Sequence, residues 1–163
     1  MVTLKDVMKS INVKLKKNLP TIPIQSTDIK EGFSRPCLYV SFDDVSTTPL
    51  NSQNISREID TKIYFFPTDI KKNKLEILEV QDIIEKKFLG RFQITEGFNT
   101  MIEEIQSEVT DGVLICEFKI SYIEEKRDED DFEDSDGTDG TGSSSDSGRS
   151  YMIENLLYNE KNN

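Results

Sequence analysis

Histidine and tryptophan are absent from the sequence of 163 residues, and cysteine occurs only twice. Without histidine, Ser-His-Asp and Cys-His catalysis are excluded, as is every metal site with an imidazole ligand. Two cysteines are too few for a four-thiolate zinc site or a disulfide framework. Because Cys37 and Cys116 both lie in apolar, strand-like runs, we expect two buried free thiols in a reducing cytoplasm.

Long apolar runs are also missing. No stretch reaches the roughly 18 apolar residues that a membrane span needs. The first residues, Met1–Asp6, lack the apolar core of a signal peptide. We therefore expect no secretion signal and no membrane partner.

Positive charge is scarce, with 20 basic side chains against 31 acidic ones and a net charge of −11. This balance argues against a basic nucleic-acid surface. The acidic excess is uneven: residues 1–123 carry a net charge of −2, residues 124–148 carry −9 and residues 149–163 are neutral. We therefore predict a nearly neutral domain, then an acidic linker, then a short C-terminal peptide.

Hydrophobic periodicity within residues 1–123 predicts two helices and several strands. Helices are expected over residues 4–19 and 73–89, a short extended segment at 22–25, strands over Cys37–Asp43, Ile55–Phe66 and Val113–Ile123, and weaker strands over Phe92–Thr95 and Met101–Val109. The polar stretch Asp44–Asn54 is typical of a long hairpin loop, and Asp111-Gly112 of a tight turn. This order favours an α+β fold, a mostly antiparallel sheet with helices packed on one face.

Each element has an expected apolar face. The first helix should bury Leu4, Val7, Met8, Ile11 and Leu15, with Thr3 as its N-cap and Asp6 three residues on; the second should bury Leu75, Leu78, Ile83 and Phe88 and end before Gly90. The strand sets are Leu38, Val40 and Phe42, then Ile55, Ile59, Ile63 and Phe65, which Arg57 and Thr61 interrupt, and finally Leu114, Cys116, Phe118, Ile120 and Tyr122. Five lysines lie mostly outside the apolar stripe of the first helix, at positions 5, 9, 14, 16 and 17. They form either a partner surface or an ordinary solvated helix face.

Residues 124–148 are acidic and then rich in glycine and serine, with Phe132 as the one sizeable apolar side chain. Such a composition predicts a flexible linker. The apolar residues that follow form a candidate docking peptide: Tyr151, Met152, Ile153, Leu156, Leu157 and Tyr158. A helix this short is marginal alone, so we expect it to dock on its own domain or on a neighbouring subunit, the alternative being a frayed end.

Two patterns resemble metal sites, but neither predicts one. The run Asp134–Gly140 has aspartate at position 6 of an EF-hand loop where glycine belongs, and Ser145 at position 12 where glutamate belongs. Asp111, Glu117 and Lys119 resemble the carboxylates and lysine of a Mg²⁺-dependent nuclease. A tight turn and outward strand alternation explain the same three residues, so we expect no catalytic residue, no metal and no cofactor.

Four stretches point to a known family. They are Leu4-Lys5-Asp6, then Ile29–Cys37 (IKEGFSRPC), then Ile63–Asp69 (IYFFPTD), and finally Ser107–Leu114 (SEVTDGVL). In this order, over three quarters of the chain, they resemble the phage tail terminator family of prophages, contractile phages and tail-like bacteriocins of low-GC Gram-positive bacteria. The long acidic insertion before Met152-Ile153-Glu154-Asn155-Leu156-Leu157 departs from the family pattern.

The resemblance implies a structural virion protein without catalytic residues. It implies a homohexameric ring on the tail tube that ends polymerisation of the tube, and of the sheath in a contractile tail, and joins the tail to the neck or connector. The expected location is the tube–neck junction of the virion tail, after assembly in the bacterial host cytoplasm, with no direct nucleic-acid specificity.

A ring of this kind needs surface residues that face its partners. We expect them in the loops around the predicted sheet, namely Phe33, Arg35, Asp43, Asp44, Asn51, Lys71 and Lys72. The C-terminal peptide is a further candidate, as an arm that bridges subunits or binds sheath. The alternative function is an acidic DNA-mimic or anti-restriction binding protein, in which the carboxylates of residues 124–139 imitate phosphates.

Overall fold

Two helices and seven strands make up the part of the chain that the computed structural model describes, residues 2–25 and 34–125. The helices are α1 (Leu4–Asn18) and α2 (Lys74–Phe88), and the strands are β1 (Ile24–Gln25), β2 (Cys37–Pro49), β3 (Asn54–Phe66), β4 (Gly90–Thr95), β5 (Phe98–Ile102), β6 (Gln106–Thr110) and β7 (Val113–Glu125). None of these helices is long and apolar enough to cross a membrane.

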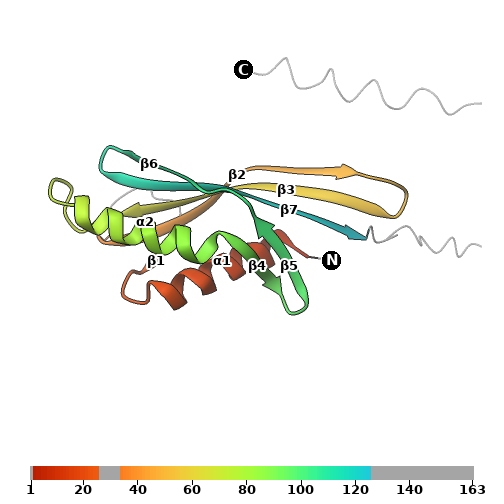
Figure 1. Ribbon diagram of the computed structural model, residues 1–163, viewed down its shortest axis with the longest axis horizontal. Coiled ribbons are helices and arrows are strands. Elements are labelled where there is room, and N and C mark those ends of the chain that lie inside the picture. The colour runs from red at the N-terminus through yellow and green to blue at the C-terminus, as the bar shows by residue number, and fades with distance from the viewer. Residues whose placement is uncertain (1, 26–33, 126–163) are drawn as a thin grey trace, which may run out of the picture. The chain divides into compact units, whose positions relative to one another are not determined.

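The main sheet has the strand order β1-β2-β3-β7-β6, and β4 and β5 form a separate hairpin. All pairings in the sheet are antiparallel except that of the short β1 with β2. Both helices and the β4–β5 hairpin lie on one side of the sheet (Figure 1). The predicted α+β class, with a mostly antiparallel sheet and helices on one face, is confirmed.

The first helix starts where its sequence predicts. The Thr3 hydroxyl accepts a hydrogen bond from the Asp6 amide at 3.1 Å, and the Thr3 amide donates to the Asp6 carboxylate at 3.0 Å, which completes a capping box. The hydrogen bonds from Thr3 also lower the pKa of Asp6. Val7, Ile11 and Leu15 are fully buried against the sheet side.

The second helix buries only part of the predicted stripe: Phe88 is buried as predicted, and Ile83 is partly buried against the core. Its buried residues are Ile77, Val80, Ile84 and Phe88. Leu75 and Leu78, which we expected inside, are 76% and 48% exposed. The reason is that α2 carries apolar residues on two sides. The side that contacts the sheet is buried, and the other side stays exposed. Gly90, with φ of +91°, follows the helix end as predicted.

The central strands β3 and β7 supply most of the sheet's buried face. The five expected residues of β7 are all buried, and so are Ile55, Ile59, Ile63 and Phe65 of β3. Thr61 does not interrupt the β3 set, because it is itself fully buried. β7 also continues through Glu125, two residues beyond the expected end at Ile123.

The predicted long hairpin loop over Asp44–Asn54 is wrong. β2 runs to Pro49 and β3 starts at Asn54, so that Val45 pairs with Ile59 and Pro49 with Ile55. A bulge between Phe42 and Asp44 shifts the register within this pairing. Strand pairing with β3 overrides the weak strand preference of aspartate, serine and proline here. The β2–β3 hairpin and the end of β7 extend past the helices (Figure 1).

The single strand predicted over Met101–Val109 is also wrong, because two strands occupy it. β5 ends at Ile102 and pairs with β4, and β6 starts at Gln106 and pairs with β7. Residues 103–105 carry the chain from one sheet to the other. The described residues therefore contain one strand more than expected.

Both cysteines are free and buried, as predicted. Burial raises the pKa of both thiols, that of Cys116 to about 11. Because only the thiolate reacts, we expect neither thiol of the folded protein to be labelled by an aromatic disulfide reagent at about pH 8. The same reagent should label both in guanidinium chloride, and rapid labelling of the folded protein would contradict the packing around them.

Candidate partner-binding surfaces

The suspected nuclease residues do not converge on one site. Asp111 lies in the tight turn after β6, with φ of +52°, and Glu117 pairs with Gln106 at the other end of that strand. Lys119 is 3.1 Å from Glu58 and 3.6 Å from Asp60, and the Lys62 ammonium is 3.6 Å from Glu117. In the described part of the chain, no group of three or more side chains with ligand atoms is placed to hold a metal.

These lysines and carboxylates form a ladder of ion pairs on the sheet face opposite the helices. The Lys62 ammonium is also 2.6 Å from Asp43, and that hydrogen bond raises the pKa of Lys62. The hydrogen bond to Glu58 likewise raises the pKa of Lys119. These side chains are between 25% and 54% exposed, and ion pairs with this much solvent contact contribute little stability. Because four carboxylates face two lysines, the ladder leaves the middle of this face with a net negative charge.

The expected partner-facing residues are spread over the molecule. Phe33 and the whole C-terminal peptide, Tyr151–Tyr158, lie outside the described residues, as does the linker from residue 126. Arg35 is half-buried, with its guanidinium 5.5 Å from the centre of the Phe66 ring and 3.3 Å from the Pro67 carbonyl oxygen, to which it donates. It is held against the domain by these contacts.

The residues expected in the first hairpin loop have three different settings. Asp43 is exposed at the bulge of β2 and pairs with Lys62. Asp44 is exposed within β2, opposite Asp60. Asn51 lies in the short turn after β2, where its side-chain oxygen accepts hydrogen bonds from the amides of Gln53 and Asn54. Asn51 therefore shapes the turn.

Lys71 and Lys72 are exposed between β3 and α2. Their backbone amides donate to the Asp69 carboxylate at 2.7 and 3.1 Å, and these bonds lower the pKa of Asp69. The Asp69 bonds thus fix the turn from which both ammonium groups project.

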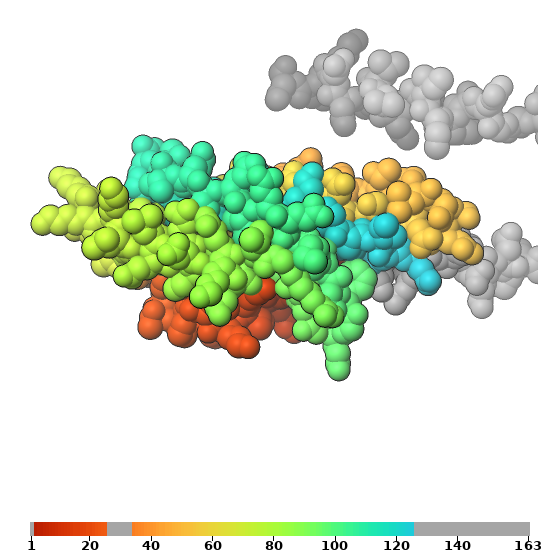
Figure 2. All heavy atoms as spheres, in the orientation of Figure 1, coloured from red at the N-terminus to blue at the C-terminus, as the bar shows by residue number. Residues whose placement is uncertain are grey.

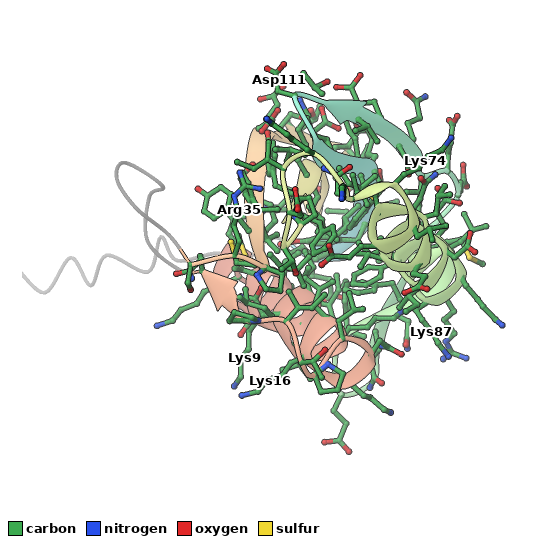
Figure 3. All side chains as sticks on the ribbon, turned by 90° about the vertical axis from the view of Figure 1, so that its left-hand side faces the viewer. Lys9, Lys16, Arg35, Lys74, Lys87 and Asp111 are labelled. Carbon is green, nitrogen blue, oxygen red and sulfur yellow. The ribbon has the colours of Figure 1, made fainter. Side chains whose placement is uncertain are left out.

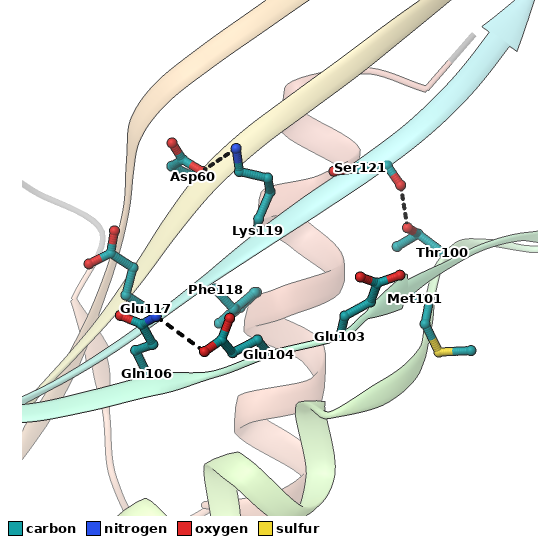
Figure 4. A pocket seen from close by; sticks show the side chains of 10 residues that line it. All are labelled: Asp60, Thr100, Met101, Glu103, Glu104, Gln106, Glu117, Phe118, Lys119 and Ser121. Carbon is teal, nitrogen blue, oxygen red and sulfur yellow. Dashed lines mark hydrogen bonds and ion pairs between the residues drawn. The ribbon is translucent and has the colours of Figure 1, made fainter.

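An acidic hollow of about 500 Å³ lies beside β7, between β5 and β6 (Figure 4). We call it the acidic surface, and define it by Asp60, Met101, Glu103, Glu104, Glu117 and Lys119. Four of its six side chains are carboxylates. Met101 is 57% exposed in the hollow, and the Glu104 carboxylate accepts a hydrogen bond from Gln106.

A basic hollow of about 700 Å³ lies between α1 and β4. We call it the basic surface, and define it by Lys9, Val13, Lys14, Lys17, Lys87 and Arg91; Asp6 and Glu96 also line the hollow. Figure 3 shows Lys9 and Lys87 on the helix side of the molecule, and Figure 2 shows α2 and the β4–β5 hairpin side by side there. The Lys14 ammonium lies 5.1 Å above the Phe88 ring and 4.9 Å above the Phe92 ring, and partial burial lowers its pKa.

The main sheet leaves two long strand edges without a strand partner among the described residues. β1 pairs only with Leu38 and Tyr39, so β2 has no neighbour on that side from Val40 to Pro49. β6 pairs with β7 only from Val113 to Glu117. Beyond this, β5 contacts β7 without strand pairing, and the Ser121 carbonyl accepts a hydrogen bond from the Thr100 hydroxyl of β5 at 2.5 Å. Such edges are suited to pairing with another chain.

Sequence reasoning missed the acidic surface entirely and found only part of the basic one. The lysines of α1 were visible as a charged stripe, but Lys87 and Arg91 join them only through the contact of α1 with β4. Residues 60, 101–104 and 117–119 come together through the strand order, which no local pattern reveals.

Comparison with known proteins gives one positive result. A search of curated proteins found no match. The sequence profile described as "Phage tail terminator protein" matches residues 6–132, which is more than half of the chain. This match confirms the resemblance seen in the sequence. The chain belongs to the phage tail terminator family and is thus a structural protein of the virion tail that contacts other tail proteins.

Proposed function

We propose that six copies of this chain form a ring on the last ring of the tail tube and end its polymerisation. The ring also presents a surface to the neck or connector, at the tube–neck junction, and in a contractile tail it ends growth of the sheath as well. Membership of the tail terminator family is the observation that carries this proposal.

The described domain has features that suit a ring subunit. A cyclic ring closes when one patch of each copy meets a different patch of its neighbour. The unpaired edge of β2 and that of β7 lie on opposite sides of β3, so they face in different directions. A single domain with two dissimilar open edges supports head-to-tail assembly.

The loops at the ends of the sheet are proposed to face the other tail proteins. Lys71 and Lys72 are exposed cations that would meet an acidic tube surface. Asp43 and Asp44 are exposed on the β2 edge, and Arg35, Phe33 and Asn51 remain candidates beside them. The peptide Tyr151–Tyr158 is proposed as an arm that bridges subunits or binds sheath.

Electron microscopy of tails assembled without this chain tests the function. We expect tubes of widely varying length without a cap at the end that meets the neck, because nothing then stops addition of tube subunits. Supplying the wild-type chain in trans should restore one tail length.

Two outcomes bear on different parts of the proposal. Capped tails of normal length in the absence of the chain would refute the terminator role. Native mass measurement of the purified chain, alone and bound to tube protein, tests the six-fold stoichiometry. A one-to-one complex with a single tube subunit would contradict the ring.

A further inference from the structure

We propose that the acidic surface of one copy binds the basic surface of the next copy, and that this contact closes the ring. The inference rests on the proposed ring and names the two patches that form its repeating interface. The occupant of each surface is therefore a second copy of this chain.

The two surfaces have opposite charge on an otherwise nearly neutral domain. The acidic hollow contains Asp60, Glu103, Glu104 and Glu117 against the one cation Lys119. The basic hollow contains five cations, Lys9, Lys14, Lys17, Lys87 and Arg91, against Asp6 and Glu96. With net charges of about −3 and +3, the two surfaces attract each other and each repels its own kind. This pattern favours a contact between unlike patches over a two-fold dimer of like patches.

Their positions allow both contacts in one copy at the same time. The basic surface uses Arg91 and Gln93 of β4, and the acidic surface uses Thr100 and Met101 of β5. β4 packs on α1 and β5 packs on β7, so the hairpin stands between the two surfaces. A copy can hence bind one neighbour through α1 and another through the β7 side.

Each surface also has an exposed apolar residue among its charges. Met101 is 57% exposed in the acidic surface and Val13 is 59% exposed in the basic surface. An apolar centre with a charged rim is the usual composition of a protein interface. Beside Met101, the β7 edge beyond Glu117 has no paired strand in the described part of the chain, so the backbone groups that β5 leaves uncovered can bond to a neighbour.

A charge-exchange experiment tests the pairing. The first variant reverses the acidic surface with Glu103→Lys and Glu104→Lys, and the second reverses the basic surface with Lys17→Glu and Arg91→Glu. All four side chains are exposed, so both variants should fold like the wild type, with unchanged circular dichroism and melting temperature. At about 150 mM salt, we expect native mass spectrometry to show rings for the wild type and monomers for each variant alone.

Mixing the two variants provides the sharper result. The acidic surface of the first variant, now positively charged, then meets the basic surface of the second variant, now negatively charged. The unchanged basic surface of the first variant likewise meets the unchanged acidic surface of the second. We expect equal amounts of the two variants to form alternating rings, and a single chain with all four substitutions to form rings by itself. A control that reverses two exposed charges on α2, Glu79→Lys with Asp82→Lys, should leave the wild-type ring intact.

The outcomes separate this inference from the proposed function. The pairing would be overturned if rings survived either reversal. It would also be overturned if both variants were monomeric and neither their mixture nor the chain with all four substitutions formed rings. The terminator role would stand in both cases. A wild-type chain that forms no ring, alone or on tail tubes, would overturn both the pairing and the ring. Rings that are lost in each variant and return when the variants are mixed, or when all four substitutions are combined in one chain, would establish the pairing of the acidic and basic surfaces.

Discussion

Replacing Glu124 with alanine is expected to lower the free energy of unfolding by about 3 kcal/mol, because it leaves a nearly buried arginine without its counter-ion. The Glu124 carboxylate is 3.6 Å from the Arg57 guanidinium, and the two side chains are 5% and 12% exposed. Glu124 also accepts a hydrogen bond from the Val2 amide at 2.7 Å. Arg57 in turn donates to the Val2 carbonyl at 3.1 Å. Together they fasten the start of the chain to β3 and β7.

The neighbouring residue provides a matched control. Glu125 is exposed one position further along β7, and Glu125→Ala should change the free energy of unfolding by less than about 0.5 kcal/mol. Urea unfolding followed by circular dichroism measures both. The double change Arg57→Met with Glu124→Leu should recover most of the loss, because no unpaired charge remains. Equal small effects of the two alanine variants would contradict the buried pair.

Truncating Phe88 to alanine is expected to cost about 3–5 kcal/mol, the range for a large aromatic removed from a close-packed core. Phe88 is 1% exposed, and its ring centre lies 5.9 Å from that of Phe92 and 5.7 Å from that of Phe118. It thus joins α2 to β4 and β7, and the Lys14 ammonium of α1 covers its face. The loss should appear as a lower denaturation midpoint at an unchanged slope.

An exposed leucine on the same helix provides a control for the effect of burial. Leu75 is 76% exposed, so Leu75→Ala removes an apolar side chain of similar chemistry without opening a cavity. We expect a change within about 0.5 kcal/mol. If Leu75→Ala were as costly as Phe88→Ala, the exposure of Leu75 would be wrong and this residue would be buried as the sequence predicts.

The sequence alone predicts the features that depend on nearby residues. Thr3 and Asp6 identify the start of α1, and Asp111-Gly112 identifies the β6–β7 turn, since capping and turn chemistry act over a few residues. The alternation in β7 predicts its buried face for the same reason. The α+β class follows from the order of these elements.

Features that depend on distant partners escape such reasoning. α2 carries two apolar stripes, and only contact with the sheet decides that Ile77 and Ile84 go inside while Leu75 stays out. Glu124 belongs by composition to the acidic linker, yet its partner Val2 lies 122 residues away in the chain. The two charged surfaces depend likewise on strand order and helix packing, which no local pattern encodes.

The bulge at Asp43 has a consequence for aggregation. A free strand edge as long as that of β2 invites copies to stack edge to edge without limit, which leads to fibres or precipitate. The bulge interrupts the regular edge just after Phe42, two adjacent carboxylates follow, and Pro49, which has no amide hydrogen to donate, ends the strand. These three devices leave only short regular stretches of edge for unlimited stacking. The β2 edge can therefore pair with one neighbour over a short stretch, but it offers no continuous template for open-ended stacking.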